Sequence, residues 1–216
     1  MCSSLGRQST NPSRLVRNTA INQLQRLLLG PQLVYDEADH SQVEEIFNSV
    51  IFPILDELLK PQVYMLDPQG MSETRLRASA LLCKAFMHFE VAQNRRNTDI
   101  RILWIEILDL LDRLISAEKS EQLVRAGSCR LCLLALNGAW QYEAVSESLK
   151  NVVLVMNAAS ILVPPPPEAE DNRDERQRTM WTATHARLER FLPGFLAEVV
   201  SVPQLTTSTD SKHVSG

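Results

Sequence analysis

The residues best suited to metal or redox chemistry are Cys129 and Cys132, which form a Cys-x-x-Cys pair. A structural zinc site needs four ligands, and no second Cys or His pair stands at a matching spacing in this sequence. A redox pair needs a strand-to-helix context, which the surrounding residues do not indicate. We therefore interpret Cys129 and Cys132 as two thiols in an apolar segment and expect no metal ligand.

The histidines and glycines form no pattern for catalysis or for phosphate binding. No histidine stands four residues from another, since they fall at His40, His88, His185 and His213. The sequence also lacks a Gly-rich loop followed by Lys and Ser or Thr, and it lacks a His-Glu-x-x-His motif. We expect no catalytic residue, no cofactor and no small-molecule substrate.

Two groups of charged residues could contact a partner protein or a membrane. Glu73, Arg75 and Arg77 form a compact charged turn at the start of an expected helix. A capped amphipathic helix with a solvated face shows the same pattern and is the simpler interpretation. Arg187 and Arg190 accompany an apolar face in the last expected helix, as in helices that lie on membranes. Packing of that face against a neighbouring helix is the favoured alternative.

The composition excludes several classes of function. The 216 residues include 22 Lys and Arg against 26 Asp and Glu, a net charge of −4, which argues against a broad nucleic-acid-binding surface. With 7 glycines and 6% aromatic residues, the chain favours helices over many-stranded sheets. The polar N-terminus does not have the pattern of a signal peptide, and no apolar run is long enough to span a membrane. We therefore expect a cytoplasmic chain with reduced thiols.

Hydrophobic periodicity predicts antiparallel amphipathic helices joined by short loops. Pro53 lies inside one of these patterns and should kink its helix, since proline removes a backbone hydrogen bond. Residues 98–116 are apolar on nearly every side, which predicts a central helix. The expected helices span residues 12–29, 41–60, 72–93, 98–116, 146–162 and 179–200. The predicted fold class is all-α, an α-solenoid of antiparallel helix pairs resembling HEAT or tetratricopeptide repeats.

Local composition divides the chain into segments. The prolines at 164–167 and the charged run after them predict a loop. Residues 123–142 contain arginine but no acidic residue, and they have the composition of an insertion, with a short helix conceivable over Cys129–Leu136. We expect a disordered N-terminus at 1–11, helical repeats at 12–122, the insertion at 123–142, a helix continuing the array at 143–163, the Pro-rich and charged loop at 164–178, the last helix at 179–200 and a disordered tail at 201–216.

Four blocks of sequence resemble one known family in their content and order. Residues 43–55 read Val-x-x-Ile-Phe-Asn-x-Val-Ile-Phe-Pro-Ile-Leu, and residues 71–84 read Met-Ser-Glu-Thr-Arg-Leu-Arg-Ala-Ser-x-Leu-Leu-x-Lys. Residues 103–109, Leu-Trp-x-x-Ile-Leu-Asp, and residues 147–156, Glu-Ser-Leu-Lys-Asn-Val-Val-Leu-Val-Met, follow them. Over residues 14–200 the chain resembles the C-terminal helical region of the large Golgi brefeldin A-resistance guanine-nucleotide exchange factors for Arf GTPases.

This resemblance implies helical repeats that lie downstream of a catalytic exchange domain, whose glutamate finger has no counterpart here. The family activates Arf at the early Golgi and supports coat recruitment, and its downstream helical domains are associated with membrane recruitment and autoregulation. The implied partners are proteins or the Golgi membrane surface, with Arf reached only through the exchange domain. The resembled family passes more directly from the helix at residues 108–115 to the block at residue 147, which indicates an insertion at 123–142. Because the resemblance covers only the end of a very long protein, the chain is expected to be a fragment, an alternative product or an incomplete gene model.

The leading hypothesis is a non-catalytic helical-repeat segment of a Golgi Arf exchange factor, cytoplasmic and peripheral at the Golgi membrane. It would serve membrane recruitment or regulation in vesicle-mediated transport. The alternative is an unrelated α-solenoid scaffold that binds a partner peptide. A small enzyme with an unrecognised site has the least support, because no polar constellation indicates one.

Overall fold

The chain folds into two rows of helices that stack side by side. The computed structural model describes residues 2–30, 45–91, 100–126, 139–166 and 171–201, and these contain helices and no strand. The elements are α1 (Cys2–Gln8), α2 (Arg14–Leu29), the π-helical turn η1 (Phe47–Ile51), α4 (Phe52–Leu58), α5 (Pro61–Tyr64), α6 (Pro68–Phe86), the π-helical turn η2 (Met87–Val91), α7 (Ile100–Ala126), α9 (Ala139–Ala158), α10 (Glu175–Phe191) and α11 (Phe195–Ser201).

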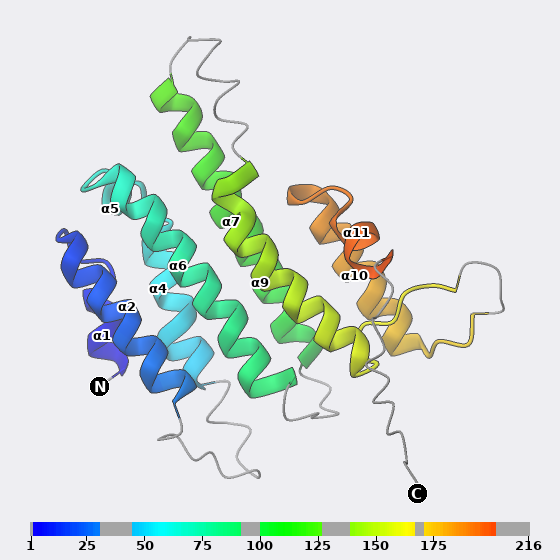
Figure 1. Cartoon of the computed structure of the whole chain (residues 1–216). Helices are drawn as coiled ribbons and strands as arrows, with labels where there is room; N and C mark the ends of the chain where they lie inside the picture. The colour runs from blue at the N-terminus through cyan, green and yellow to red at the C-terminus, as the bar shows by residue number, and fades with distance from the viewer. Residues whose placement is uncertain (1, 31–44, 92–99, 127–138, 167–170, 202–216) are drawn as a thin grey trace, which may run out of the picture.

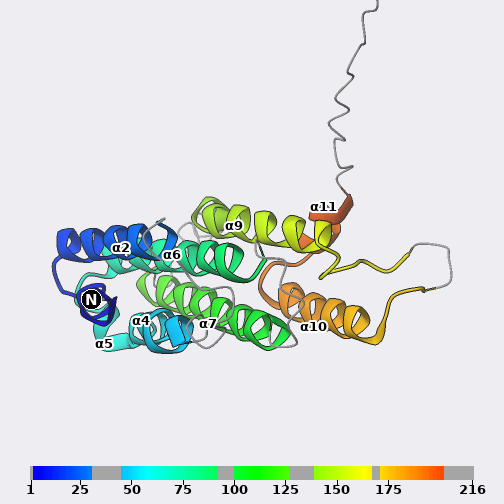
Figure 2. The same ribbon diagram turned by 90° about the horizontal axis from the view of Figure 1, so that it is seen from below.

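The arrangement of these helices is that of an α-solenoid. Consecutive long helices run in opposite directions (Figure 1). Seen from below, α2, α6 and α9 form one row, and α1, α4, α7 and α10 form the other (Figure 2). The predicted all-α solenoid of antiparallel helix pairs is therefore confirmed.

The hydrophobic core lies between the two rows. Its largest fully buried side chains include Trp104, Phe86 and Phe47, and the rings of Phe86 and Trp104 stack with centroids 5.2 Å apart. Burial of each such side chain contributes roughly 1.5–3 kcal/mol. Helix α7 supplies much of this core, as its apolar sequence predicts, but Ile102 departs from the pattern with 63% of its surface exposed.

The N-terminal segment expected to be disordered contains a helix. Helix α1 covers Cys2–Gln8 and packs against α2 and η1. A methyl group in place of the Gly6 hydrogen would lie 3.4 Å from the Ile54 side chain, so the backbone of α1 runs close to α4. Tertiary contacts stabilise this seven-residue helix, whose sequence is too short and too polar to predict one.

The helix expected at residues 41–60 is not continuous within its described part. Proline cannot donate to the carbonyl four residues earlier, and its ring collides with that carbonyl in a regular helix. The chain accommodates Pro53 by a π-helical turn at Phe47–Ile51, in which the N–H of Phe52 donates to the oxygen of Phe47. Pro53 then stands in the first turn of α4. The predicted kink is therefore a π-turn followed by a new helix.

The helix expected at residues 179–200 is also divided. Helix α10 ends at Phe191 and α11 begins at Phe195, so Pro193 separates two helices instead of kinking one. Gly194 turns the chain with a φ of 77°, in the left-handed region that glycine adopts most easily. Helix α10 also begins earlier than expected, because Asp174 and Gln177 form a reciprocal capping box.

Several other helices extend beyond the residue ranges expected from the sequence. Residues 61–70, which lie between two of the expected helices, hold α5 and the first residues of α6, which begins at Pro68. Helix α7 extends to Ala126, and α9 begins at Ala139. The two ends of the segment expected to be an insertion are therefore helical, while the helix considered over Cys129–Leu136 lies outside the described residues. The origin of the segment stays a prediction.

Candidate functional site

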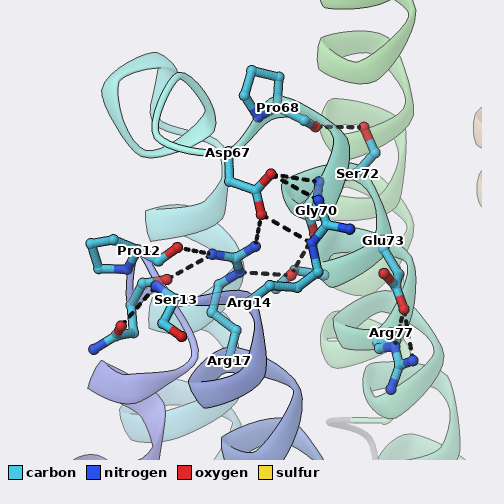
Figure 3. Close-up of polar contacts among 12 residues, drawn as sticks. Pro12, Ser13, Arg14, Arg17, Asp67, Pro68, Gly70, Ser72, Glu73 and Arg77 are labelled. Carbon is cyan, nitrogen blue, oxygen red and sulfur yellow. Dashed lines mark hydrogen bonds and ion pairs between the residues drawn. The ribbon is translucent and has the colours of Figure 1, made fainter.

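A buried arginine lies at the contact between α2 and α6. Arg17 is fully buried, and its Nε donates to Oγ1 of Thr74 at 3.0 Å. Its Nη1 donates to the backbone oxygens of Asn11 and Pro12, both at 2.8 Å. Its Nη2 bonds Oδ2 of Asp67 at 2.6 Å (Figure 3). All three nitrogens of the guanidinium thus have acceptors within the fold, as burial of a charge requires.

Asp67 is the acceptor that completes this cluster and begins the next helix. Its carboxylate caps α6 by accepting the Gly70 N–H at 3.2 Å. It also accepts hydrogen bonds from Arg14, with Nη2 to Oδ1 at 2.9 Å. Hydrogen bonds from Arg14 and then Arg17 hold the pKa of Asp67 far below its usual range, against the opposing effect of burial. The side chain of Asp67 therefore stays ionised while it joins α2 to α6.

Gly70 leaves space for the cluster. A methyl group on its Cα would lie 2.0 Å from Oδ2 of Asp67 and 2.6 Å from Nη2 of Arg17. Both distances are too short for non-bonded atoms, so any larger residue would displace the charged groups. The contacts of Arg17 lie within the fold, and we interpret the cluster as the link that holds α2 against α6. The sequence shows Asp-Pro-x-Gly as a helix start, but nothing in it pairs Arg17 with Asp67.

The three charged residues predicted near the start of α6 separate in the structure. Glu73 and Arg77 pair across one helical turn, with Oε1 and Nη2 2.7 Å apart and both side chains partly exposed. Arg75 is only 3% exposed. Its Nε donates to the Leu58 oxygen at 2.9 Å, and its guanidinium lies 4.7 Å from the Tyr64 ring centroid. Arg75 therefore joins α6 to the α4–α5 turn and is covered in this structure, so the partner contact considered for it stays a prediction.

Arg187 and Arg190 meet at one carboxylate on the neighbouring helix. Oδ1 of Asp109 lies 2.9 Å from Nε of Arg187 and 2.9 Å from Nη2 of Arg190. Arg190 also lies 3.4 Å from Oδ2 of Asp112. These pairs hold α10 on α7, so the two arginines serve an internal contact in this structure. They lie in the other helix row from Glu73 and Arg77, and the predicted residues do not form one site (Figure 2).

The apolar face of α10 is buried against the fold. Met180, Leu188 and Phe191 are almost fully covered. Thr184, on the same face, accepts a hydrogen bond from Nε1 of Trp104 at 2.9 Å, and both groups are buried. Packing against a neighbour, the favoured interpretation of this helix, matches the structure. A membrane-surface role for α10 would first require its separation from α7.

A groove opens between α4 and α7 on the opposite side of α7 from α10. It encloses about 290 Å³. Its apolar lining comes from Phe52 on α4 and from Ile102, Ile105 and Leu110 on α7. Nothing in the sequence indicates this groove, because Ile102 has the residue type of a core position.

Two further findings concern metals and membranes. Among the residues that the structure describes, no three His, Cys, Asp or Glu side chains gather as metal ligands would. Cys129 and Cys132 lie outside those residues. Cys83 is buried, and its burial raises the pKa of the thiol to about 12, which makes it a poor nucleophile. Within the same described part of the chain, no helix has the length and apolarity needed to cross a bilayer.

The fold and its contacts define a helical-repeat protein, in which each helix pair buries its apolar faces on the next pair. A family model described as the GBF1-like tetratrico peptide repeat region matches residues 1–195. The chain belongs to this family, as the sequence resemblance predicted. The alternative of an unrelated solenoid is therefore wrong. The matched region is the family's helical-repeat region and not its catalytic exchange domain.

Individual relatives agree with this assignment. The chain is 30% identical over 219 residues to the Golgi-specific brefeldin A-resistance guanine nucleotide exchange factor 1 homolog of Caenorhabditis elegans, covering 98% of this chain and 9% of that protein. It is 25% identical over 205 residues to the ARF guanine-nucleotide exchange factor GNOM of Arabidopsis thaliana, covering 93% of this chain and 12% of that protein. The chain thus spans about a tenth of the length of these relatives. No solved structure matches it.

Proposed function

We propose that this chain is a non-catalytic helical-repeat segment of a guanine-nucleotide exchange factor for Arf, serving membrane recruitment and regulation in Golgi vesicle transport. The observation that supports this most is the family match over residues 1–195, joined to relatives named as Arf exchange factors. The Golgi assignment draws on the name of the Caenorhabditis elegans relative. Its cellular place would be the cytoplasmic face of the Golgi, as a peripheral protein.

The contacts of the described residues favour a binding role over a catalytic one. Arg17 bonds Thr74 and Asp67 within the fold, and Arg187 and Arg190 are held by Asp109. Helical repeats commonly present long surfaces to partner proteins. We propose protein partners or the membrane surface for this segment, with Arf engaged through the exchange domain of the complete protein.

Exchange activity is tested with the purified chain and Arf loaded with fluorescent GDP. We expect the rate of GDP release to equal that of Arf alone, while a full-length relative included in parallel accelerates it. Acceleration by this chain would overturn the non-catalytic assignment.

Recruitment is tested in the full-length worm relative by removing the region that corresponds to this chain. The expected result is a lower Golgi-bound fraction in cells, with an unchanged rate of nucleotide exchange in solution. A control removes an equal length of another helical segment, so that shortening alone is accounted for. An unchanged Golgi-bound fraction would contradict the recruitment role, and an altered exchange rate would assign the segment to autoregulation.

A further inference from the structure

The row formed by α1, α4, α7 and α10 has one open interval. Between α1 and α4 the Gly6 backbone lies against Ile54. Between α7 and α10 the space is closed by the Asp109 ion pairs and by the Trp104–Thr184 hydrogen bond. Between α4 and α7 the helices have little close backbone contact, and the groove of about 290 Å³ lies there instead.

The lining of this groove suits an apolar side chain. Of the residues that line it, Phe52 and Leu110 are nearly buried, whereas Ile102 is 63% exposed. A water molecule takes roughly 30 Å³ in the liquid, so the groove has the volume of several water molecules. One or two side chains would fill that space. It falls at the lower limit of pockets that hold small organic ligands, roughly 300–1,000 Å³. The size therefore favours an anchor residue of a protein over a free metabolite.

The charges around the groove leave one carboxylate without a partner among the described residues. Asp56 pairs with Arg113 at 3.1 Å, and Asp109 is held by the α10 arginines. Glu106 is exposed, lines the groove, and has no hydrogen bond or ion pair to another residue of the described chain. The unpaired charge at the groove is therefore negative.

Ile102 and Glu106 stand four residues apart on α7, so they lie on one face of the helix, one turn from each other. We propose that the α4–α7 groove binds a helical segment of a partner protein that presents an aliphatic or aromatic side chain and, about one turn away, a lysine or arginine. The apolar side chain fills the groove beside Ile102, and the cation pairs with Glu106. This binding site is independent of the function proposed above.

The test uses a labelled alanine-based helical peptide of about 18 residues, long enough to be helical in water, with leucine and lysine four residues apart. Binding to the full chain is followed by fluorescence anisotropy. Ile102→Ser and Glu106→Lys should each weaken binding by about fivefold or more, as loss of an interface anchor does. Leu15→Ser and Glu198→Lys are matched controls at exposed positions outside the groove, and they should bind like the parent chain.

A charge exchange makes the test specific. A second peptide carries glutamate in place of lysine, and it should bind the Glu106→Lys variant better than the parent chain. Equal binding of both peptides to all variants would overturn the proposal. Self-association of the parent chain in sedimentation, abolished by Ile102→Ser, would also overturn it, because the groove would then receive a second copy. Circular dichroism confirms that each variant keeps its helices.

Discussion

Two contacts between neighbouring helices use charge in different ways. At the α2–α6 contact, Arg17 is fully buried, and three kinds of acceptor hold its guanidinium: a carboxylate, a hydroxyl and backbone oxygens. At the α7–α10 contact, the ion pairs of Asp109 lie at the surface, and a neutral Trp104–Thr184 hydrogen bond occupies the interior. Both contacts join adjacent members of a row.

This difference predicts different responses to mutation. A buried charge that loses its partners is strongly destabilising, whereas an exposed pair contributes little because water and salt compete for it. Substitutions at the α2–α6 contact should therefore be strongly destabilising. The α7–α10 contact should depend on packing and on one buried hydrogen bond, with its ion pairs adding little.

The largest effect is expected from Arg17→Ala. The change leaves Thr74 and two backbone oxygens without their arginine donor, removes one of the two arginine partners of Asp67 and opens a cavity, so the free energy of unfolding should fall by about 2–5 kcal/mol. Urea denaturation followed by circular dichroism measures it. Arg26→Ala, at an exposed position of the same helix, is the control and should change stability by less than about 0.5 kcal/mol. If Arg17→Ala and Arg26→Ala lowered the free energy of unfolding equally, the buried cluster would contribute no more than an exposed surface charge.

The second-largest effect is expected from acid, which should weaken the α2–α6 contact. The folded pKa of Asp67 is depressed, so its contribution is complete above the unfolded pKa of about 3.9 and is lost as the pH falls below that value. Stability should fall between about pH 5 and pH 2 by more in the parent chain than in Asp67→Asn, which cannot titrate there. Denaturation midpoints across this range measure the slope. Parallel slopes would show that other carboxylates govern the acid response.

Gly70→Ala tests the close packing of the same cluster. Helix propensity alone predicts a gain of about 1 kcal/mol from this change. We expect instead a loss of about 1–3 kcal/mol, because the added methyl collides with the Asp67 carboxylate and the Arg17 guanidinium. Gly6→Ala is the matched control, since its methyl would meet Ile54 at an ordinary 3.4 Å. If Gly70→Ala raised the free energy of unfolding as much as Gly6→Ala does, the side chains of Asp67 and Arg17 would have to shift to make room for the methyl group.

The sequence predicted the rows of helices far better than it predicted this cluster. Periodicity identifies an apolar face from positions within one helix, and α6, α7, α9 and α10 all follow such patterns. Arg17 and Asp67 are 50 residues apart, and their pairing depends on how α2 stacks on α6. The burial of Arg75 was missed for a related reason, because it depends on how the α4–α5 turn packs on α6. The helix at Cys2–Gln8 likewise depends on contacts with α2 and η1.

Trp104→Phe tests the interior of the α7–α10 contact. The change keeps an aromatic ring against Phe86 but removes the donor to Thr184, leaving a buried hydroxyl without its partner. The expected loss is about 1–2 kcal/mol. The double variant Trp104→Phe with Thr184→Val should recover part of it, and Trp181→Phe on α10 serves as the control at a less buried tryptophan. Failure of the valine to recover stability would assign the loss to packing and not to the hydrogen bond.

The smallest effect is expected from Asp109→Ala, although this substitution removes ion pairs to two arginines. Asp109 and Arg190 are both substantially exposed, so water solvates the freed arginines and the loss should be about 0.2–1 kcal/mol. The loss should nearly vanish in about 1 M salt, where charges are screened within roughly 3 Å. Arg17→Ala should keep its effect under the same salt, because the Arg17 side chain is fully buried. Salt-resistant destabilisation by Asp109→Ala would mean that the surface pairs hold α10 as firmly as the buried cluster holds α2, and the two contacts would then differ in geometry alone.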